Sequence, residues 1–157
     1  MYMYLGVKSD RAKGREMNST PDTAVWDGVV ALHAHVEQRL AAALQRGHGL
    51  GLSEYRALGH LAVAERSELR MQELAAKIGL NQSSVTRLAG RLVAAGLAVR
   101  DDCPDDRRGV YAVLTDAGRE RHAAAGATYG ATLAEALDDA AADPSLAPTV
   151  AALRPSA

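Results

Sequence analysis

The side chains best suited to ligand chemistry in this 157-residue chain lie between Asn81 and Arg91. If this stretch is a helix, one of its faces carries short polar side chains at the N-terminal end, arginines further along and no acid. The residues of this face are Gln82, Ser83, Thr86, Arg87, Gly90 and Arg91. In a helix that enters a DNA groove, side chains at the N-terminal end meet base edges while arginines hold phosphates. A solvated helix face without a partner has a similar composition, so this face alone leaves both interpretations open.

A charged turn follows this stretch. Two short runs rich in β-branched and aromatic residues, Leu97–Arg100 and Val110–Leu114, are typical of β-strands. The residues between them include four aspartates, a proline and a glycine, which favour a turn. Arg107 and Arg108 lie at its tip, where arginines beside a reading helix can enter a narrow minor groove of negative potential. An ordinary solvated turn is the alternative interpretation.

Two short helices and a tight turn are predicted to position these groups. The first covers Gln72–Ile78, because apolar residues recur there on one helical face. Gly79 is expected to end it in a left-handed conformation, and Asn81 to cap the second helix, which ends at Gly96. The buried stripe predicted for the second helix is Val85, Leu88, Ala89 and Leu92. This is the pattern of a helix-turn-helix followed by a β-wing.

The rest of the chain is predicted to be mostly helical, giving a mainly α fold with a small β-wing. The expected helices are Thr23–Gln45, capped by Asp22 or Thr23, then Ser53–Ala64, capped by Ser53, Asp116–Asp138, capped by Thr115, and Pro148–Leu153. Leu69–Met71 is expected to add a third strand to the wing sheet. Residues 1–20 are predicted to be a disordered tail, within which Met17 is an alternative translation start, and residues 21–157 to form a single domain.

Composition narrows the class of protein. The net charge is −1, but it is segregated: residues 74–100 hold four basic side chains and no acid, whereas residues 135–157 hold four acids and one arginine. The chain has no run of 18 apolar residues, no signal-peptide pattern and one cysteine, which favours a cytoplasmic protein. We therefore expect a small basic face for specific binding and no membrane partner.

Several of these motifs occur in one order that resembles the MarR family of multiple antibiotic resistance regulators. The residues that carry the resemblance are Gln72-Glu-Leu-Ala-Ala, Ser84-Val-Thr-Arg-Leu, Leu92-Val-Ala-Ala-Gly-Leu, Asp106-Arg-Arg-Gly and Leu114-Thr-Asp-Ala-Gly118. The family's wing pattern looks like Asp-x-Arg-Asp-x-Arg. Here Cys103-Pro104-Asp105 replaces its first half, so only one of its two arginine positions is filled, by Arg108.

The resemblance implies a dimeric winged helix-turn-helix regulator whose DNA affinity falls when a small molecule binds. Residues 52–115 would form the winged helix-turn-helix, and residues 22–46 and 116–157 the dimerisation helices. The effector pocket would lie between the two parts, lined by aromatic and histidine side chains that are elsewhere more often core or interface residues: Trp26, His33, Tyr55, His60 and Tyr111. Ser83, Thr86 and Arg87 would meet bases or nearby phosphates, and Gln82, Ser84 and Arg91 would hold phosphates or the helix start.

Other functions have weaker support in the sequence. No pair of histidines or of histidine and cysteine has metal-ligand spacing, so we expect no metal and no cofactor. Cys103 lies among four aspartates that disfavour its thiolate, which argues against redox sensing. Neither a phosphate loop nor a nucleophile elbow is present, so we expect no enzyme. The expected partners are double-stranded DNA, a second copy of the chain and a small-molecule effector. A winged-helix module that binds a protein, and a metal- or redox-sensing regulator, remain as alternatives.

Overall fold

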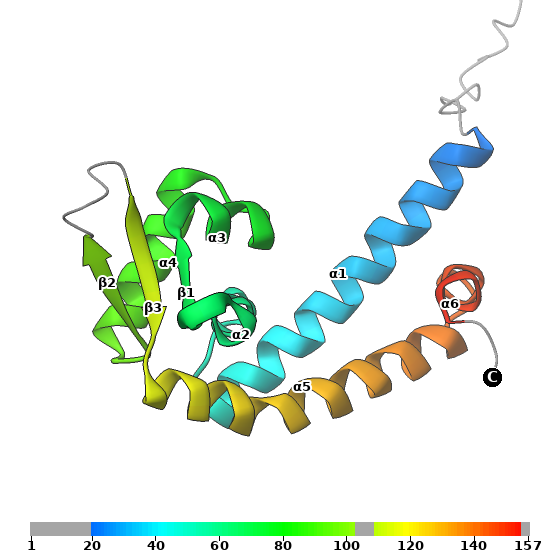
Figure 1. The fold of residues 1–157 in the computed structure, drawn as a ribbon. Helices are drawn as coiled ribbons and strands as arrows, with labels where there is room; N and C mark the ends of the chain where they lie inside the picture. Colours follow the sequence, from blue (N-terminus) through cyan, green and yellow to red (C-terminus); the bar gives the residue numbers. More distant parts are fainter. Residues whose placement is uncertain (1–19, 103–108, 155–157) are drawn as a thin grey trace, which may run out of the picture.

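A computed structural model describes residues 20–102 and 109–154 (Figure 1). The chain is mostly helical, with one small antiparallel sheet, as the sequence predicts. In chain order the elements are α1 (Pro21–His48), α2 (Leu52–Val63), the 3₁₀ turn η1 (Glu65–Ser67), β1 (Glu68–Arg70), α3 (Met71–Ile78), α4 (Gln82–Ala94), β2 (Ala98–Asp102), β3 (Val110–Leu114), α5 (Asp116–Ala142) and α6 (Ala147–Leu153).

The elements from α2 to β3, residues 52–114, pack together as one body that we call the winged lobe (Figure 1). Its three strands lie in the order β1-β3-β2, so that β3 is the central strand and both of its neighbours run antiparallel to it. Leucines from every helix of the lobe fill its core, among them Leu58, Leu74 and Leu88, which have no exposed surface. Leu40 and Leu44 of α1 and Ala125 of α5 extend the same core beneath the lobe.

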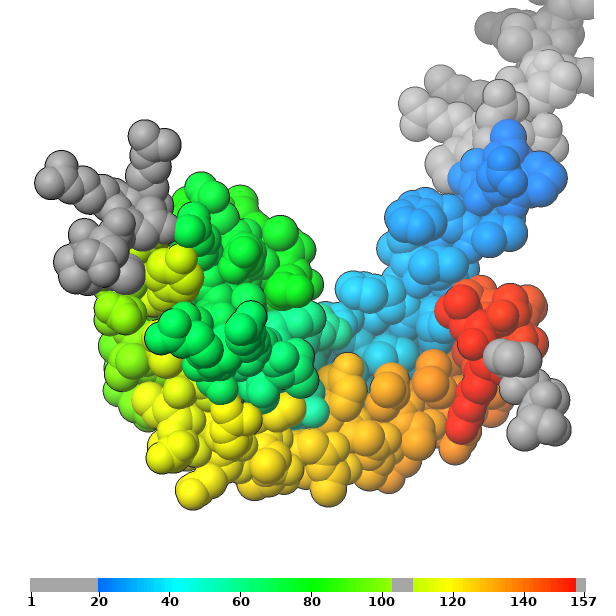
Figure 2. Space-filling model, viewed as in Figure 1, coloured from blue at the N-terminus to red at the C-terminus, as the bar shows by residue number. Residues whose placement is uncertain are grey.

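Two long helices leave the winged lobe and meet α6 at their far end. We call this region, residues 21–36, 136–142 and α6, the distal end (Figure 1). It has a small core of its own, in which Leu32, Ala140, Leu146 and Val150 are buried. In the space-filling view the N-terminal half of α1 stands clear of the winged lobe (Figure 2).

The helix-turn-helix and its caps follow the sequence prediction. Gly79 ends α3 with φ of 69°, a left-handed conformation that costs glycine little because it has no Cβ. The Asn81 side chain accepts a hydrogen bond from the backbone N–H of Ser84 at 2.9 Å, which caps α4 as predicted. Thr115 caps α5 in the same way, through the N–H of Gly118 at 3.0 Å.

Three local predictions were wrong. Thr20, rather than Asp22 or Thr23, caps α1, because Pro21 supplies the first helical position and needs no N–H partner. Gly51, rather than Ser53, is the N-cap of α2, and the Glu54 carboxylate accepts a hydrogen bond from its backbone N–H. The first strand is Glu68–Arg70 rather than Leu69–Met71, since Met71 already begins α3.

Some predictions fall outside the described residues. They are the N-terminal tail, Cys103 and the two wing-tip arginines, Arg107 and Arg108. Within residues 20–102 and 109–154, none of the helices combines the length and the hydropathy that crossing a bilayer requires.

Candidate nucleic-acid interface

Helix α4 is held by one face and open to solvent on the other. Val85, Leu88 and Leu92 recur at helical spacing and are at most 1% exposed, so they fix the rotation of the helix about its axis. This rotation exposes the predicted reading side chains Gln82, Ser83, Thr86, Arg87 and Arg91, whereas Ser84 is half-buried at the cap. The structure thus brings all of the predicted α4 side chains to one end or face of a single rigid helix.

The first turn of α4 has a defined hydroxyl pattern. The Ser83 hydroxyl donates to Asn81 Oδ1 at 3.0 Å, and the Thr86 hydroxyl donates to the Gln82 carbonyl at 2.8 Å. Each hydroxyl proton is therefore used within the protein, and each hydroxyl oxygen keeps lone pairs that face solvent. The exposed edge of this turn can accept hydrogen bonds from a ligand, while the Gln82 amide can both donate and accept.

The two arginines of α4 lie in different surroundings. Arg87 forms no hydrogen bond or ion pair with the residues that the structure describes. Arg91 Nε donates to Glu54 Oε1 at 2.8 Å, which ties α4 to the start of α2. The same carboxylate accepts from the Gly51 N–H through its other oxygen, so Glu54 fixes the α2 start and Arg91 together. Arg87 is consequently the cation of α4 with its full charge turned to solvent.

The wing strands carry further cations beside α4. On β2, Arg100 Nε lies 3.3 Å from the Asp102 carboxylate. Arg70, the residue before α3, donates from Nε to the Tyr111 hydroxyl at 2.8 Å, and its guanidinium lies 5.4 Å from the centre of that ring. Sequence reasoning missed Arg70 and Glu54. A basic residue directly before the first helix of the motif was the available signal for Arg70, and the Gly51-to-Glu54 spacing of a helix cap was the signal for Glu54.

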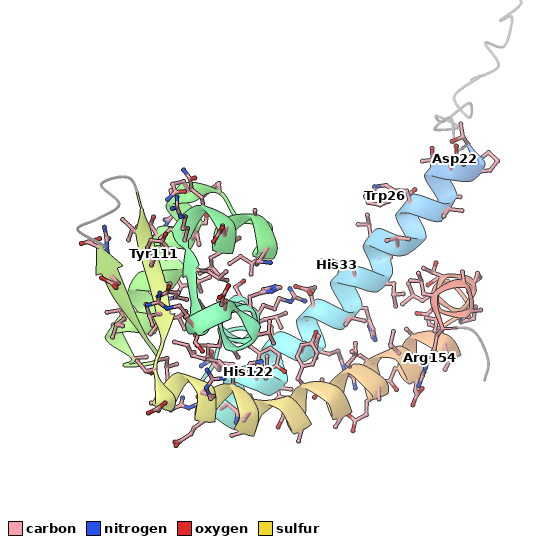
Figure 3. All side chains as sticks on the ribbon, viewed as in Figure 1. Asp22, Trp26, His33, Tyr111, His122 and Arg154 are labelled. Carbon is pink, nitrogen blue, oxygen red and sulfur yellow. The ribbon has the colours of Figure 1, made fainter. Side chains whose placement is uncertain are left out.

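The five side chains predicted for an effector pocket do not line one cavity in the described part of a single chain. Trp26 and His33 lie on the exposed side of α1, far from Tyr111 on the wing (Figure 3). Tyr55 is stacked between His122 and Tyr129, with ring centres 4.7 Å apart in both pairs. His60 and Tyr111 do share a depression of about 540 Å³ beside η1. Of the five side chains, the structure therefore brings only His60 and Tyr111 to one depression in the described residues, and Trp26, His33 and Tyr55 lie elsewhere.

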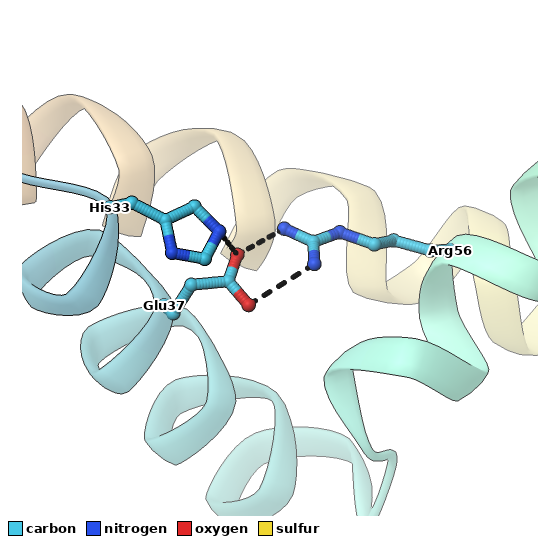
Figure 4. A network of polar contacts seen from close by, with 3 residues as sticks. All are labelled: His33, Glu37 and Arg56. Carbon is cyan, nitrogen blue, oxygen red and sulfur yellow. Dashed lines mark hydrogen bonds and ion pairs between the residues drawn. The ribbon is translucent and has the colours of Figure 1, made fainter. Parts of the chain in front are cut away.

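A polar network connects α1 to the winged lobe near the predicted pocket. Arg56 of α2 makes two hydrogen bonds to the Glu37 carboxylate of α1, and His33 Nε2 lies 3.6 Å from the same carboxylate (Figure 4). The Arg56 hydrogen bonds hold the pKa of Glu37 below its ordinary value. In the neighbouring stack, burial raises the pKa of Tyr55 and lowers the pKa of His122. Glu37 gives the α1–α2 contact a dependence on pH, and His122 gives one to the contact between α2 and α5.

The described residues offer little for metal chemistry. Across residues 20–102 and 109–154, His, Cys, Asp and Glu side chains do not gather in groups of three that could hold an ion. The histidines have other partners instead: His48 Nε2 lies 2.8 Å from the Thr128 hydroxyl, and His35 Nε2 lies 3.2 Å from the Ala136 carbonyl.

Comparison with known proteins gives this arrangement a family. The sequence model of the MarR family matches residues 48–109. A curated relative, the uncharacterized HTH-type transcriptional regulator YkoM of Bacillus subtilis (strain 168), is 34% identical over 73 residues, 46% of each chain. The chain thus aligns with about half the length of that relative.

Solved structures extend the similarity beyond the motif. Sco3205, a MarR family transcriptional regulator from Streptomyces coelicolor solved in complex with DNA, is 32% identical, with a TM-score of 0.70 over 77% of either chain. AbsC, another MarR family transcriptional regulator from that organism, is 28% identical, with a TM-score of 0.70 over 87% of this chain and 93% of its own. From the motif match and the extent of the similarity to Sco3205, we conclude that the chain belongs to the MarR family.

Proposed function

We propose that the protein is a sequence-specific, DNA-binding transcriptional repressor that binds a palindromic operator as a homodimer and leaves it when a small molecule binds. It would act in the cytoplasm and catalyse no reaction. The observation that carries the proposal is the exposed, acid-free face of α4, held in a fixed rotation by Val85, Leu88 and Leu92. The similarity to Sco3205, which was solved with DNA bound, supports it.

Different side chains of α4 would contact different parts of the DNA. Ser83, Thr86 and Arg87 would reach base edges or nearby phosphates from the N-terminal half of the helix, as in other helices that enter the major groove. Gln82, Ser84 and Arg91 would hold phosphates or the helix start, while Arg107 and Arg108 would enter the minor groove. Arg91 would contribute less than Arg87, because Glu54 already neutralises its charge.

A second copy would complete the distal end. Val25, Trp26 and Val30 of α1 and Leu153 of α6 are each at least 50% exposed, which is more apolar surface than so small a region usually leaves in water. Burying these side chains in a two-fold interface would present two copies of α4 to the half-sites of a palindrome, which lie about one helical turn of DNA apart. Such a dimer would repress by covering a promoter. Its effector would act between the winged lobe and the dimer helices, where Glu37 and Arg56 meet.

The direct test is a titration of the protein into labelled DNA from its own upstream region and into scrambled DNA of equal length, at several salt concentrations. The specific DNA should bind roughly 10³-fold or more tighter than the scrambled DNA. Arg87→Ala should weaken specific binding by about 1–3 kcal/mol if it reads a base. The matched control, Arg91→Ala, should have a smaller effect and a smaller change in salt slope.

Two outcomes would decide against the proposal. Equal, weak binding to both DNAs and to fragments selected from the whole genome would favour a protein-binding winged helix instead. A larger loss for Arg91→Ala than for Arg87→Ala would contradict the roles assigned on α4. Release by an effector is tested separately, by screening small molecules for those that lower operator affinity without unfolding the protein.

A further inference from the structure

The first turn of α5 is fixed to one side of the winged lobe by close backbone contacts. The Thr115 hydroxyl donates to the Gly96 carbonyl at 2.7 Å, and the Thr115 N–H donates to the Leu97 carbonyl at 3.2 Å. Gly118 lies so close to this segment that a Cβ at its position would be 2.0 Å from the Leu97 oxygen. α5 is thus anchored at the turn between α4 and β2.

Arg119 provides a second anchor on another side of the lobe. Its guanidinium donates to the Ala62 carbonyl at 3.4 Å and to the Ser67 hydroxyl. Ala62 precedes, and Ser67 belongs to, a turn in which Arg66 and Ser67 both have φ of 57°, a left-handed conformation that costs energy for residues with a Cβ. Directly after this turn comes β1, which pairs with the central wing strand β3. Arg119 therefore connects α5 to a strained turn that leads into the wing sheet.

A third contact lies further along α5, where His122 and Tyr129 stack on the Tyr55 ring of α2. The angle between α5 and the winged lobe therefore depends on all three contacts, and among them Arg119 is the one that reaches the turn leading into β1. With 27 residues at about 1.5 Å per residue, α5 is about 40 Å long. A change of about 10° at its first turn would move the far end by roughly 7 Å, which equals the rise of about two base pairs. When each winged lobe keeps its orientation on the DNA, the same small angle would shift the lobe relative to the distal end by up to that amount.

We propose that Arg119 is a positioning residue that restricts which half-site spacing the dimer accepts. This inference rests on the DNA-binding function proposed above and deepens it. The two described partners of Arg119 lie near the end of α2 and in the turn before β1, so it acts through this turn rather than by touching DNA. Without Arg119, α5 would keep the anchor at Gly96 and Leu97 and the stack on Tyr55, and its angle to the winged lobe would be less restricted.

The experiment measures binding to a set of operators that differ only in half-site spacing. A palindromic site selected with the wild-type protein is shortened or lengthened by one or two base pairs, and affinity is measured for each. The wild type should prefer one spacing. Arg119→Ala should reduce the ratio between preferred and altered spacings by roughly threefold to tenfold, while affinity for an isolated half-site stays unchanged.

Arg121→Ala is the matched control. Arg121 lies two residues further along α5, and its guanidinium donates at 3.0 Å to the His48 carbonyl of α1 rather than to the winged lobe. Removing it deletes the same charge from the same turn of α5, on another face of the helix, and leaves both anchors in place. It should keep the wild-type spacing preference.

A second variant separates positioning from stability. Arg66→Gly relieves the left-handed strain at the turn, so the double variant Arg66→Gly with Arg119→Ala should regain thermal stability lost by Arg119→Ala alone. It should still accept the altered spacings, because the second anchor is missing. A return to the wild-type preference in the double variant would mean that Arg119 has a merely structural role, and would overturn the inference.

A measurement without DNA keeps the inference separate from the proposed function. Spin labels on Ala95→Cys at the end of α4, in a Cys103→Ser background, report the distance between the two winged lobes of a dimer. Arg119→Ala should broaden this distance distribution and Arg121→Ala should not. An unchanged distribution overturns the inference. A different result is that the wild type binds no DNA specifically while Arg119→Ala still broadens the distribution. That result would refute the proposed function and keep Arg119 as a residue that restricts the angle of α5.

Discussion

The two ends of α5 differ in how completely the side chains around them are buried within a single chain. At its start, the helix enters the Leu-rich core of the winged lobe, where Leu58, Leu74 and Leu88 have no exposed surface. At its end, alanines and one leucine contact α6 and α1, and nearby Trp26 and Val30 remain at least 50% exposed. The winged lobe therefore has a closed leucine core in a single chain, whereas the distal end has a small core and a cluster of exposed apolar side chains to share with a second chain.

This difference matches the division of labour in the proposed function. A helix that reads DNA must keep a fixed rotation, and a dense core of leucines resists rotation because interiors pack without voids. An interface between copies needs exposed apolar side chains instead, so part of its core exists only in the assembly. The comparison predicts that equivalent changes at the two ends have unequal consequences.

The largest effect is expected from Leu88→Ala in α4. Leu88 is fully buried among the other leucines of the winged lobe, so truncation should lower the free energy of unfolding by about 4 kcal/mol through lost burial and a residual cavity. Leu146→Ala, which truncates a buried leucine of the distal end, should cost only about 2 kcal/mol, since its small cluster can collapse. Equal losses in chemical denaturation would break the comparison.

The glycines of α5 provide a test within one helix. Gly118→Ala should destabilise the protein by about 2–3 kcal/mol, because the added Cβ would meet the Leu97 carbonyl, a backbone atom that cannot move cheaply. Gly126 has open space where a Cβ would lie, so Gly126→Ala should stabilise α5 by about 0.5–1 kcal/mol. Thermal unfolding of both variants measures the difference. Loss of stability in Gly126→Ala would show that the middle of α5 is closely covered in the dimer.

The sequence was informative where structure depends on near neighbours in the chain. Gly79, Asn81 and Thr115 reveal helix ends because a cap depends on residues three or four positions apart. The stripe of α4 was predictable for the same reason, so its exposed face was too.

Contacts between distant residues could not be predicted in this way. Arg91 has no partner in its own helix, and its pairing with Glu54 follows only from the way α2 packs against α4. A turn at Glu65–Glu68 was predictable, but the left-handed Arg66 and Ser67 are not glycines and give no local signal, so the strain of that turn and its Arg119 contact were missed. The predicted effector set failed to gather in one cavity because histidine and tyrosine are equally suited to stacks such as His122 on Tyr55.

An intermediate effect is expected from Trp26→Ala at the distal end. Trp26 is 64% exposed in a single chain, so its loss should hardly change the packing of that chain. If a second copy covers it, truncation should weaken dimerisation by about 2 kcal/mol, which raises the dissociation constant roughly thirtyfold. Sedimentation over a range of concentrations measures this. Val63→Ala is the control, because Val63 is 84% exposed at the end of α2, in the winged lobe, and should leave dimerisation unchanged.

The smallest effects concern pH and arise where α2 meets the two long helices. Burial lowers the pKa of His122, so the unfolded chain takes up a proton near the ordinary value of 6.5 while the folded chain does not. Stability should therefore be full above pH 6.5 and fall as the pH drops below it, until His122 is protonated in the folded state as well. His122→Phe keeps a ring against Tyr55 and should remove this slope.

The Glu37→Gln variant tests a second pH range, below that of His122, in which stability changes. Hydrogen bonds from Arg56 lower the pKa of Glu37, so its contribution is present above the ordinary value of 4.5 and is lost as the pH falls through the folded value. Glu37→Gln should flatten the stability curve below pH 4.5 and leave the slope that begins just below pH 6.5 as in the wild type. His122→Phe should do the reverse, so each variant controls for the other. If both variants flattened the stability curve over the same pH range, the Glu37–Arg56 pair and the His122–Tyr55 stack would titrate together. The contacts of α2 with α1 and with α5 would then be coupled to each other.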